Sequence, residues 1–246
     1  GLEDPFVGVV KGVILSINPE ATVIDLTHLI PPQDILQAGL VLRSAYKFFP
    51  PQTIHLVVVD PGVGSSRKPI VVDSPPYLYV GPDNGVFSFV IGDNFSAYLL
   101  ENPSFFLPEI SHTFHGRDIF APVAAHLSLG VHPSVMGRKL ESIERLSLPS
   151  PIFQGDRIIG QIISFDHFGN AITNIPQELL EGRKESIIRV GEYKIEGLSA
   201  SYAERKPLTP LAIIGSSGFL EIAINLASAR QFLNLQKGDE VEVILP

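Results

Sequence analysis

Cysteine and tryptophan are absent from this sequence of 246 residues, and methionine occurs once. Without cysteine the chain can form no disulfide, no thiolate metal site and no cysteine nucleophile. No apolar run reaches the roughly 18 residues that a membrane helix needs, and the first residues do not form a charged-then-apolar secretion signal. We expect a cytoplasmic protein with no membrane partner, although the lack of cysteine itself shows only that no disulfide is needed.

Charged residues are scarce: they make up 18% of the chain, against 45% hydrophobic residues, and the net charge is −8. Lysine and arginine are scattered, so no basic stripe is available to replace the counterions of a nucleic acid, and we expect no nucleic-acid partner. The apolar excess indicates either a large core or subunit interfaces that bury additional surface.

Common cofactor-binding and hydrolase motifs are also missing. The segment PGVGSS lacks the third glycine of a dinucleotide-binding loop and the lysine of a phosphate-binding loop. The sequence contains no GxSxG, no HExxH and no DxD. Any catalytic site must therefore be built from other residues.

The most informative stretch that is present runs from Ile54 to Arg67, IHLVVVDPGVGSSR. Its apolar run predicts a strand over residues 54–59 that is buried on both faces. Asp60 then lies at the carboxyl end of that strand, where open α/β sheets bind ligands. Two glycines allow a tight turn, so Arg67 can reach back to the carboxylate. The alternative is that Asp60 only caps the turn.

A second candidate is His115, which lies just before a predicted helix over residues 118–129. Its imidazole is then close to the amides at the helix end, although a loop histidine can equally serve only in packing. A divalent metal site is a further alternative, because such ions prefer oxygen and imidazole ligands; the candidates are Asp60, Asp83, Asp118 and His115. No spacing typical of a metal site supports it.

Helical and strand patterns alternate over the first part of the chain, which predicts an α/β domain with a mainly parallel sheet and helices on its faces. We expect helices over residues 5–17, from 31–34 to 49, and 118–129. We expect strands over residues 22–25, 54–59, 69–73 and 77–80.

A linker rich in serine and proline, SLPSP, precedes a change of pattern near residue 151. Beyond it, short β-rich runs are separated by glycine and aspartate turns, which predicts a small antiparallel barrel or sandwich. We therefore expect two domains, residues 1–150 and 151–246.

Two turns of the second domain carry polar groups. Residues 166–170, DHFGN, are either a hairpin turn or a pocket wall that offers a carboxylate for a cation, an aromatic face for stacking and an amide for recognising a base. Residues 215–218, GSSG, form a second turn rich in hydroxyl groups. Neither turn indicates a function by itself.

Together, five segments resemble the S-adenosyl-L-methionine hydroxide adenosyltransferases, a family related to the fluorinases and chlorinases. Each motif is weak alone, but five in series, spanning essentially the whole chain, are hard to obtain by chance. In chain order the segments are VVDPGVGSSR, GPDNGVFS, FHGRDIFAPVAAHL, FDHFGNAITNI and GSSGFLEIAINLASA.

The resemblance implies a three-layer α/β domain followed by a small β-barrel domain. It also implies a homotrimer that binds S-adenosylmethionine between the first domain of one subunit and the second domain of its neighbour. The implied activity is hydrolysis of S-adenosylmethionine to adenosine and L-methionine, by attack of water or hydroxide at the ribose C5′. No cofactor and no metal are expected.

The resemblance also implies roles for individual residues. The residues that position the attacking water are Asp60, Arg67 and His115. The substrate-binding residues are Asp83, Asn84, Asp166, Phe168, Asn170, Ser216, Glu221 and Leu226, with Asn170 and the Leu226 backbone on the adenine and Asp166, Ser216 and Glu221 near the methionine end. The family begins with a strand ending in a ribose-binding aspartate, which we expect to precede Gly1.

Three other functions remain open from the sequence: a halide-dependent adenosyltransferase, a non-catalytic module that binds S-adenosylmethionine or adenosine, and a metal-dependent hydrolase using Asp60, Asp83 and His115. A carboxylate at the nucleophile position would repel chloride by about 4 kcal/mol at 4 Å and an effective dielectric constant of about 20. Asp60 therefore favours water over halide.

Overall fold

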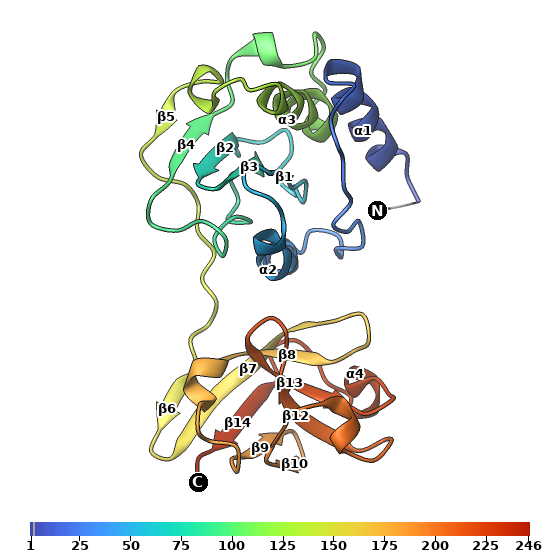
Figure 1. Ribbon diagram of the computed structural model, residues 1–246, viewed down its shortest axis with the longest axis vertical. Coiled ribbons are helices and arrows are strands. Elements are labelled where there is room, and N and C mark those ends of the chain that lie inside the picture. The colour runs from blue at the N-terminus through green and yellow to red at the C-terminus, as the bar shows by residue number, and fades with distance from the viewer. Residues whose placement is uncertain (2) are drawn as a thin grey trace. The chain divides into compact units, whose positions relative to one another are not determined.

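The computed structural model describes residues 1 and 3–246 (Figure 1). Contacts between residues divide the chain into two compact units, Gly1–Ser147 and Leu148–Pro246. The division that the sequence predicted, between residues 150 and 151, lies three residues further along the chain.

The first unit is an α/β domain with a five-stranded sheet in the order β1-β3-β2-β4-β5. Its strands are β1 (Ile54–Leu56), β2 (Pro69–Ser74), β3 (Tyr77–Pro82), β4 (Ser96–Leu99) and β5 (Lys139–Leu140). Its helices are α1 (Phe6–Ile17), α2 (Ile35–Ala45), α3 (Ala121–Ser128), the 3-10 turns η1 (Tyr46–Phe48), η2 (Pro103–Phe105) and η4 (Pro133–Val135), and the π-helical turn η3 (Gly116–Phe120).

The two-domain α/β class is confirmed, but the expectation of a mainly parallel sheet is wrong. Among the described strand pairs of this unit only β1 and β3 run parallel, whereas β2–β3, β2–β4 and β4–β5 are antiparallel. The reason is the short connection between β2 and β3, because a two-residue link at Pro75 and Pro76 can only reverse the chain.

Helices cover both faces of this sheet (Figure 1). Side chains alternate along β2, so that Ile70 and Val72 join the core formed with α2, whereas Val71 joins the core formed with α3. α1 in turn packs against α3. The expected arrangement of three layers is therefore confirmed.

Two expected strands differ from the structure. The apolar run at 54–59 forms a strand only over Ile54–Leu56 and is not buried on both faces, because among the described strands β1 pairs only with β3 and Val58 is 41% exposed. Residues 22–25 form no strand; they lie in a segment without regular structure between α1 and α2. In the 54–59 run most side chains are at least partly buried, whereas residues 22–25 are all exposed, so the apolar composition of the second run did not indicate burial.

The second unit is a sheet of nine strands that nearly closes into a barrel, as expected. The order is β10-β9-β14-β7-β8-β13-β12-β11, with β6 paired to β7, and β10 also contacts β12. The strands are β6 (Ile152–Gln154), β7 (Arg157–Phe165), β8 (Ala171–Pro176), β9 (Ile187–Val190), β10 (Tyr193–Glu196), β11 (Leu198–Ser199), β12 (Pro210–Ile214), β13 (Phe219–Ile224) and β14 (Glu240–Ile244). Short helical turns are η5 (Gln177–Leu180), η6 (Tyr202–Glu204) and α4 (Ala229–Phe232).

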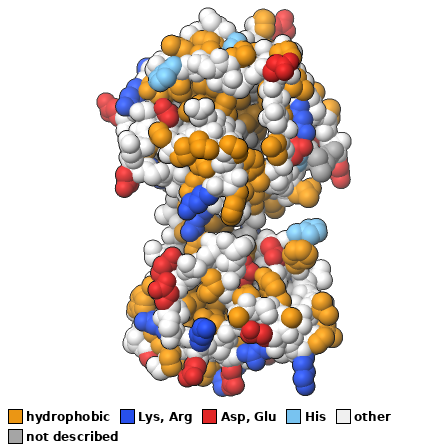
Figure 2. All heavy atoms as spheres, in the orientation of Figure 1, with side chains coloured by type: hydrophobic (Ala, Val, Ile, Leu, Met, Phe, Trp, Pro, Cys, Tyr) orange, Lys and Arg blue, Asp and Glu red, His pale blue; other side chains and the backbone are white. Residues whose placement is uncertain are grey.

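Hydrophobic side chains gather over much of the visible face of the first unit (Figure 2). Among the described large apolar side chains of this unit, the most exposed are Ile24, Leu29 and Phe48, at 66%, 70% and 87% exposure. No helix among the described residues is long and apolar enough to cross a membrane.

Candidate active site

The structure brings Asp60 and Arg67 together at the end of the chain segment that follows β1. Arg67 Nε donates to Asp60 Oδ1 at 2.9 Å, and Arg67 Nη2 donates to Asp60 Oδ2. The two side chains are only 5% and 7% exposed. This fork-to-carboxylate geometry fixes both groups in one orientation, because each oxygen receives its own N–H.

His115 joins the pair from a segment 48 residues further along the chain. Its Nδ1 atom lies 3.2 Å from Arg67 Nη2. Since a guanidinium only donates, Nδ1 accepts and the proton of the neutral ring lies on Nε2. Burial lowers the pKa of His115 and the positive charge of Arg67 lowers it further, against the opposing effect of Asp60. The imidazole is therefore neutral at pH 7.

The loop between Asp60 and Arg67 is shaped by a close backbone contact. Gly64 has φ +75°, and a Cβ atom at this position would lie 2.3 Å from the carbonyl oxygen of His112. Ser65 Oγ donates to Gly62 O at 2.6 Å and accepts from Arg67 N at 3.2 Å. The turn thus packs directly against the segment that leads to His115.

A buried aspartate, Asp118, holds the segment before His115. It is fully buried and accepts from Ser111 N at 2.8 Å and from Arg117 Nε at 2.5 Å. Burial acts to raise the pKa of Asp118, but the hydrogen bonds from Arg117 and Ser111 outweigh it and hold the pKa below its ordinary value. From the sequence, Asp118 was a candidate only as a metal ligand; the Arg-Asp pair at the start of a helix was the signal for this structural role.

The π-helical turn η3 follows His115 and carries Asp118. It precedes α3 without interruption, and the Phe120 ring lies 5.3 Å from the guanidinium carbon of Arg67. Single π turns inside helices occur often at functional sites. Here the turn places the Phe120 ring against the Arg67 guanidinium and brings the His115 segment next to Arg67.

A groove of about 1450 Å³ in the first unit is lined by Asp60, Val63 and His115, together with side chains of α1 and of the 18–30 segment. Arg67 Nη1 is buried and has no hydrogen-bond partner within the described part of the chain. The site therefore offers a carboxylate and a neutral imidazole at a groove, and the Nη1 amino group of Arg67 remains unused.

Asp83 and Asn84, expected to bind substrate, make contacts to backbone groups in the first unit. Asn84 Nδ2 donates to Val59 O at 2.9 Å, and Asp83 Oδ1 accepts from Glu144 N at 2.8 Å. Asp83 is buried, and burial raises its pKa. A role of these residues in substrate binding remains a prediction.

The metal alternative finds no support in these contacts. Within residues 1 and 3–246, no group of three or more histidine, cysteine, aspartate or glutamate side chains is placed to hold a metal ion. Asp118 is bonded to Arg117 and Ser111, and Asp83 is bonded to Glu144.

In the second unit the structure brings together part of the expected substrate-binding set. Asp166 accepts from the Asn170 backbone N–H and from Asn170 Nδ2, both at 2.8 Å. Arg230 N donates to Gly169 O at 2.9 Å, so this turn packs against the segment after β13. Phe168 in the turn is 74% exposed, and Leu226 in the segment after β13 is 82% exposed.

Glu221 on β13 is a buried carboxyl group. Tyr202 donates its hydroxyl to Glu221 Oε2 at 3.2 Å. Burial raises the pKa of Glu221, and the nearby charge of Asp166 adds to this; burial and Glu221 together raise the pKa of Tyr202 to about 12. Ser216, in the turn before β13, is exposed.

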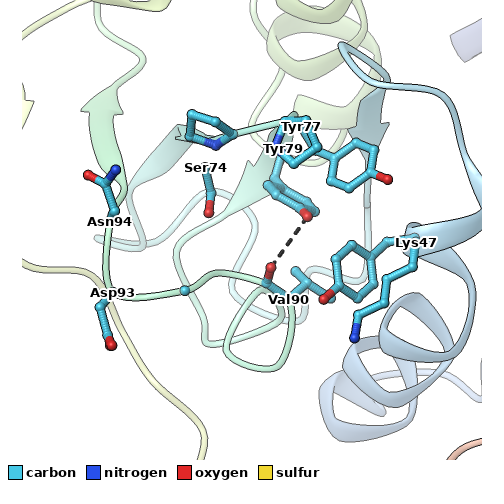
Figure 3. A pocket seen from close by; sticks show the side chains of 11 residues that line it. Lys47, Ser74, Tyr77, Tyr79, Val90, Asp93 and Asn94 are labelled. Atoms are coloured by element: carbon cyan, nitrogen blue, oxygen red, sulfur yellow. Dashed lines mark hydrogen bonds between the residues drawn. The ribbon is translucent and has the colours of Figure 1, made fainter.

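A second cavity, of about 600 Å³, lies against the turn between β2 and β3 (Figure 3). Tyr79 donates its hydroxyl to Val90 O at 3.4 Å, and Lys47 and Asp93 lie on opposite sides of the cavity. His55 stacks on the Tyr79 ring at 5.2 Å, and burial lowers the pKa of His55 to about 4. This cavity contains none of the expected site residues.

The fold and the site define a two-domain α/β protein in which a buried Asp-Arg pair and a half-buried histidine lie beside a groove. Residues 1–137 match the family SAM hydroxide adenosyltransferase N-terminal domain, and residues 160–242 match SAM hydroxide adenosyltransferase C-terminal domain. The chain belongs to the SAM hydroxide adenosyltransferase family.

Individual relatives agree with this assignment. A protein of Thermus thermophilus named (R)-S-adenosyl-L-methionine hydrolase is 38% identical, over 99% of this chain and 96% of its own length. A fluorinase of Nocardia brasiliensis is more distant, at 27% identity over 99% of this chain and 93% of its own length. The crystal structure of an uncharacterized conserved protein from Thermotoga maritima is 41% identical with a TM-score of 0.92, covering 99% of this chain and 97% of that one.

Proposed function

We propose that this protein hydrolyses S-adenosylmethionine to adenosine and L-methionine. The observation that carries the proposal is the contact of Arg67 with both Asp60 and His115 beside the groove of the first unit. Relatives that share the whole length of the chain and are named (R)-S-adenosyl-L-methionine hydrolase support it.

In the proposed reaction, a water oxygen attacks the ribose C5′ and forms the new C–O bond. The C5′–S bond breaks with its electron pair on sulfur, which leaves as the neutral thioether of methionine. The water proton passes to solvent by way of Asp60. Asp60 orients the water, and His115 donates a hydrogen bond from Nε2 to the water oxygen. Arg67 holds Asp60 and His115 in place and stabilises the developing hydroxide character.

The charges of this reaction explain why the protein needs to position the reactants more than to activate a leaving group. Hydroxide is negative and sulfonium is positive, so charge disappears in the transition state and a water-poor groove favours the reaction. We propose that neither a cofactor nor a metal takes part. Turnover that is unchanged by a chelating agent is the expected result, and a loss restored by a divalent metal would contradict it.

Substrate recognition is proposed to involve the second unit. Asn170 and the Leu226 backbone are candidates for the adenine, with Phe168 packing nearby. Asp166, Ser216 and Glu221 are candidates for the amino-acid end of the substrate. Replacing Asn170 by alanine is expected to raise KM for S-adenosylmethionine more than it lowers kcat, since the residue binds substrate and transition state alike.

We further propose a homotrimer in which the site is completed at a subunit interface. The exposed apolar side chains of the first unit support this assembly, because contact with another subunit would remove them from water. Light scattering should give a mass near three times 26.8 kDa. A fully active monomer would contradict the proposal.

The decisive experiment is chromatography of S-adenosylmethionine incubated with the protein. Adenosine and methionine in equal amounts are expected, whereas binding without products would identify the chain as a binding module. The halide alternative is tested in the same assay at high chloride. The unmodified protein should form no 5′-chloro-5′-deoxyadenosine, and Asp60→Gly should relieve the repulsion of about 4 kcal/mol that excludes the anion.

A further inference from the structure

The pairing between β1 and β3 ends before the chain reaches Asp60. The described bonds run as far as Val57 N, which donates to Val80 O at 3.0 Å. On β3 the next residue, Gly81, approaches so closely that a Cβ atom there would lie 2.4 Å from Val57 O, and Pro82 has no N–H to donate. The sheet ladder therefore does not fix the peptide that precedes Asp60.

The side chain of Asn84 holds that peptide. Asn84 Nδ2 donates to Val59 O at 2.9 Å, and Asn84 Oδ1 accepts from Val86 N at 3.2 Å. The Val59 carbonyl belongs to the same planar group as the Asp60 N–H. Fixing this plane limits the rotation of the Asp60 backbone, and with it the direction of the carboxylate.

The same turn also holds the other end of the loop. The backbone N–H of Asp83 donates to Lys68 O at 2.8 Å, immediately after Arg67. The two neighbouring residues Asp83 and Asn84 thus bind the chain just before Asp60 and just after Arg67. Their own turn is anchored by Glu144 N, which donates to Asp83 Oδ1.

We infer that Asn84 is a positioning residue for the reaction, which acts through Asp60 and not by contact with substrate. The inference rests on the proposed function for its kinetic test. Without the Asn84 amide, Asp60 is expected to lose its alignment with Arg67. Small displacements of a reacting group can lower turnover by about a hundredfold.

Asn102 provides a matched control. Its Nδ2 atom donates to Val135 O at 3.0 Å and its Oδ1 atom accepts from Ser104 N at 3.2 Å. Each of the two asparagines therefore uses its side chain to bind a backbone carbonyl distant in the sequence and the backbone N–H of the second residue that follows it. Asn102 lies before η2 and contacts no residue of the candidate active site among the described hydrogen bonds.

The test compares Asn84→Asp with Asn102→Asp, each of which replaces an N–H donor by a carboxylate oxygen. Both variants should lose similar thermal stability. Only Asn84→Asp should lower kcat, by about tenfold or more with KM within about twofold. A normal kcat in Asn84→Asp would overturn the inference, and so would an equal decrease of kcat in both variants. If Asn84→Asp does not fold, the alanine variants at both positions give the same comparison.

Acidic pH supplies a readout that a general loss of stability would not mimic. When the introduced carboxyl group is protonated, its O–H can donate to Val59 O again. A hydrogen bond that only the protonated form can donate raises the pKa of this carboxyl group above the ordinary value of about 3.9. The ratio of kcat in Asn84→Asp to kcat in the unmodified protein should therefore rise as the pH is lowered from about 7 to about 4. A constant ratio would count against the positioning role.

Crystal structures of the two variants separate this inference from the proposed function. Asp60 should move away from Arg67 in Asn84→Asp and stay in place in Asn102→Asp. An unmoved Asp60 in Asn84→Asp overturns the positioning role, whatever the activity. A failure of the unmodified protein to cleave S-adenosylmethionine instead overturns the proposed function.

Discussion

Arg67 donates to both carboxylate oxygens of Asp60, and neither side chain is more than 7% exposed. A buried pair of this kind is costly to disturb, because removal of one partner leaves the other charge without compensation, at a cost of about 3–5 kcal/mol. The Asp60–Arg67 pair is therefore expected to be rigid as well as reactive.

Arg67→Lys tests the geometry of the pair. A lysine keeps the charge but cannot donate to both oxygens of Asp60 and to His115 at once. We expect kcat to fall by about a hundredfold while S-adenosylmethionine binding, measured by calorimetry, stays close to normal. Arg138→Lys is the control, because the pair of Arg138 with Glu101 is exposed. Normal turnover in Arg67→Lys would contradict the proposed role.

The pH dependence of turnover should report on His115. Its pKa is lowered below the ordinary 6.5 by burial and by Arg67, so the ring is neutral at pH values above this lowered pKa. As pH falls through the lowered pKa, protonation turns Nδ1 into a donor that faces Arg67, and kcat should fall. His115→Gln should be slow at every pH and lack this acidic limb. An acidic limb that persists unchanged in His115→Gln would assign it to another group.

Asp118 should matter for folding of the His115 segment. Asp118→Asn weakens the bonds from Arg117 and Ser111 in a fully buried position, and the free energy of unfolding in urea should fall by about 1–3 kcal/mol. Asp156→Asn is the control, since Asp156 is 72% exposed and lies 3.9 Å from Arg157; its effect should stay below about 0.5 kcal/mol. Equal effects would contradict the importance of the buried contacts.

Glu221 should make stability depend on pH. Its folded-state pKa is raised above 4.5 by burial and by Asp166, so between pH 4.5 and that raised pKa the folded protein holds a proton that the unfolded chain has released. The free energy of unfolding contributed by this group therefore falls as pH rises through the window. Denaturation at several pH values should show that the free energy of unfolding of Glu221→Gln, relative to that of the unmodified protein, rises as pH increases through this window. The same difference should stay constant for Glu178→Gln, an exposed control.

The local sequence correctly predicted contacts between residues that are close together in the chain. Arg67 lies only seven residues from Asp60 across a glycine-containing turn, and the side chains meet as expected. His115 was placed beside them by resemblance alone, because no local pattern relates residues 48 positions apart. The antiparallel course of most of the first sheet was missed, since an alternation of patterns does not show which strands are neighbours.

The contacts of Asp83 and Asn84 show the same limit. The sequence correctly indicated a strand at residues 77–80, but the groups that the residues after this strand bind, Val59 and Glu144, lie 25 and 61 residues away. A strand at residues 22–25 was expected from the local hydrophobic pattern, yet the segment forms no strand in the structure. Hydrogen-bond and strand partners separated by so many residues are determined by the tertiary fold, which a local sequence pattern does not contain.

The contact between Gly64 and the His112 carbonyl has a consequence for protein engineering. A Cβ atom at position 64 would lie 2.3 Å from the His112 carbonyl oxygen and is therefore excluded. The backbone of the Asp60 to Arg67 loop thus packs directly against the backbone of the segment before His115. A transplant of this chemistry into another scaffold must therefore move both segments as one unit. Libraries that randomise either loop should keep glycine at position 64 and vary the two loops jointly.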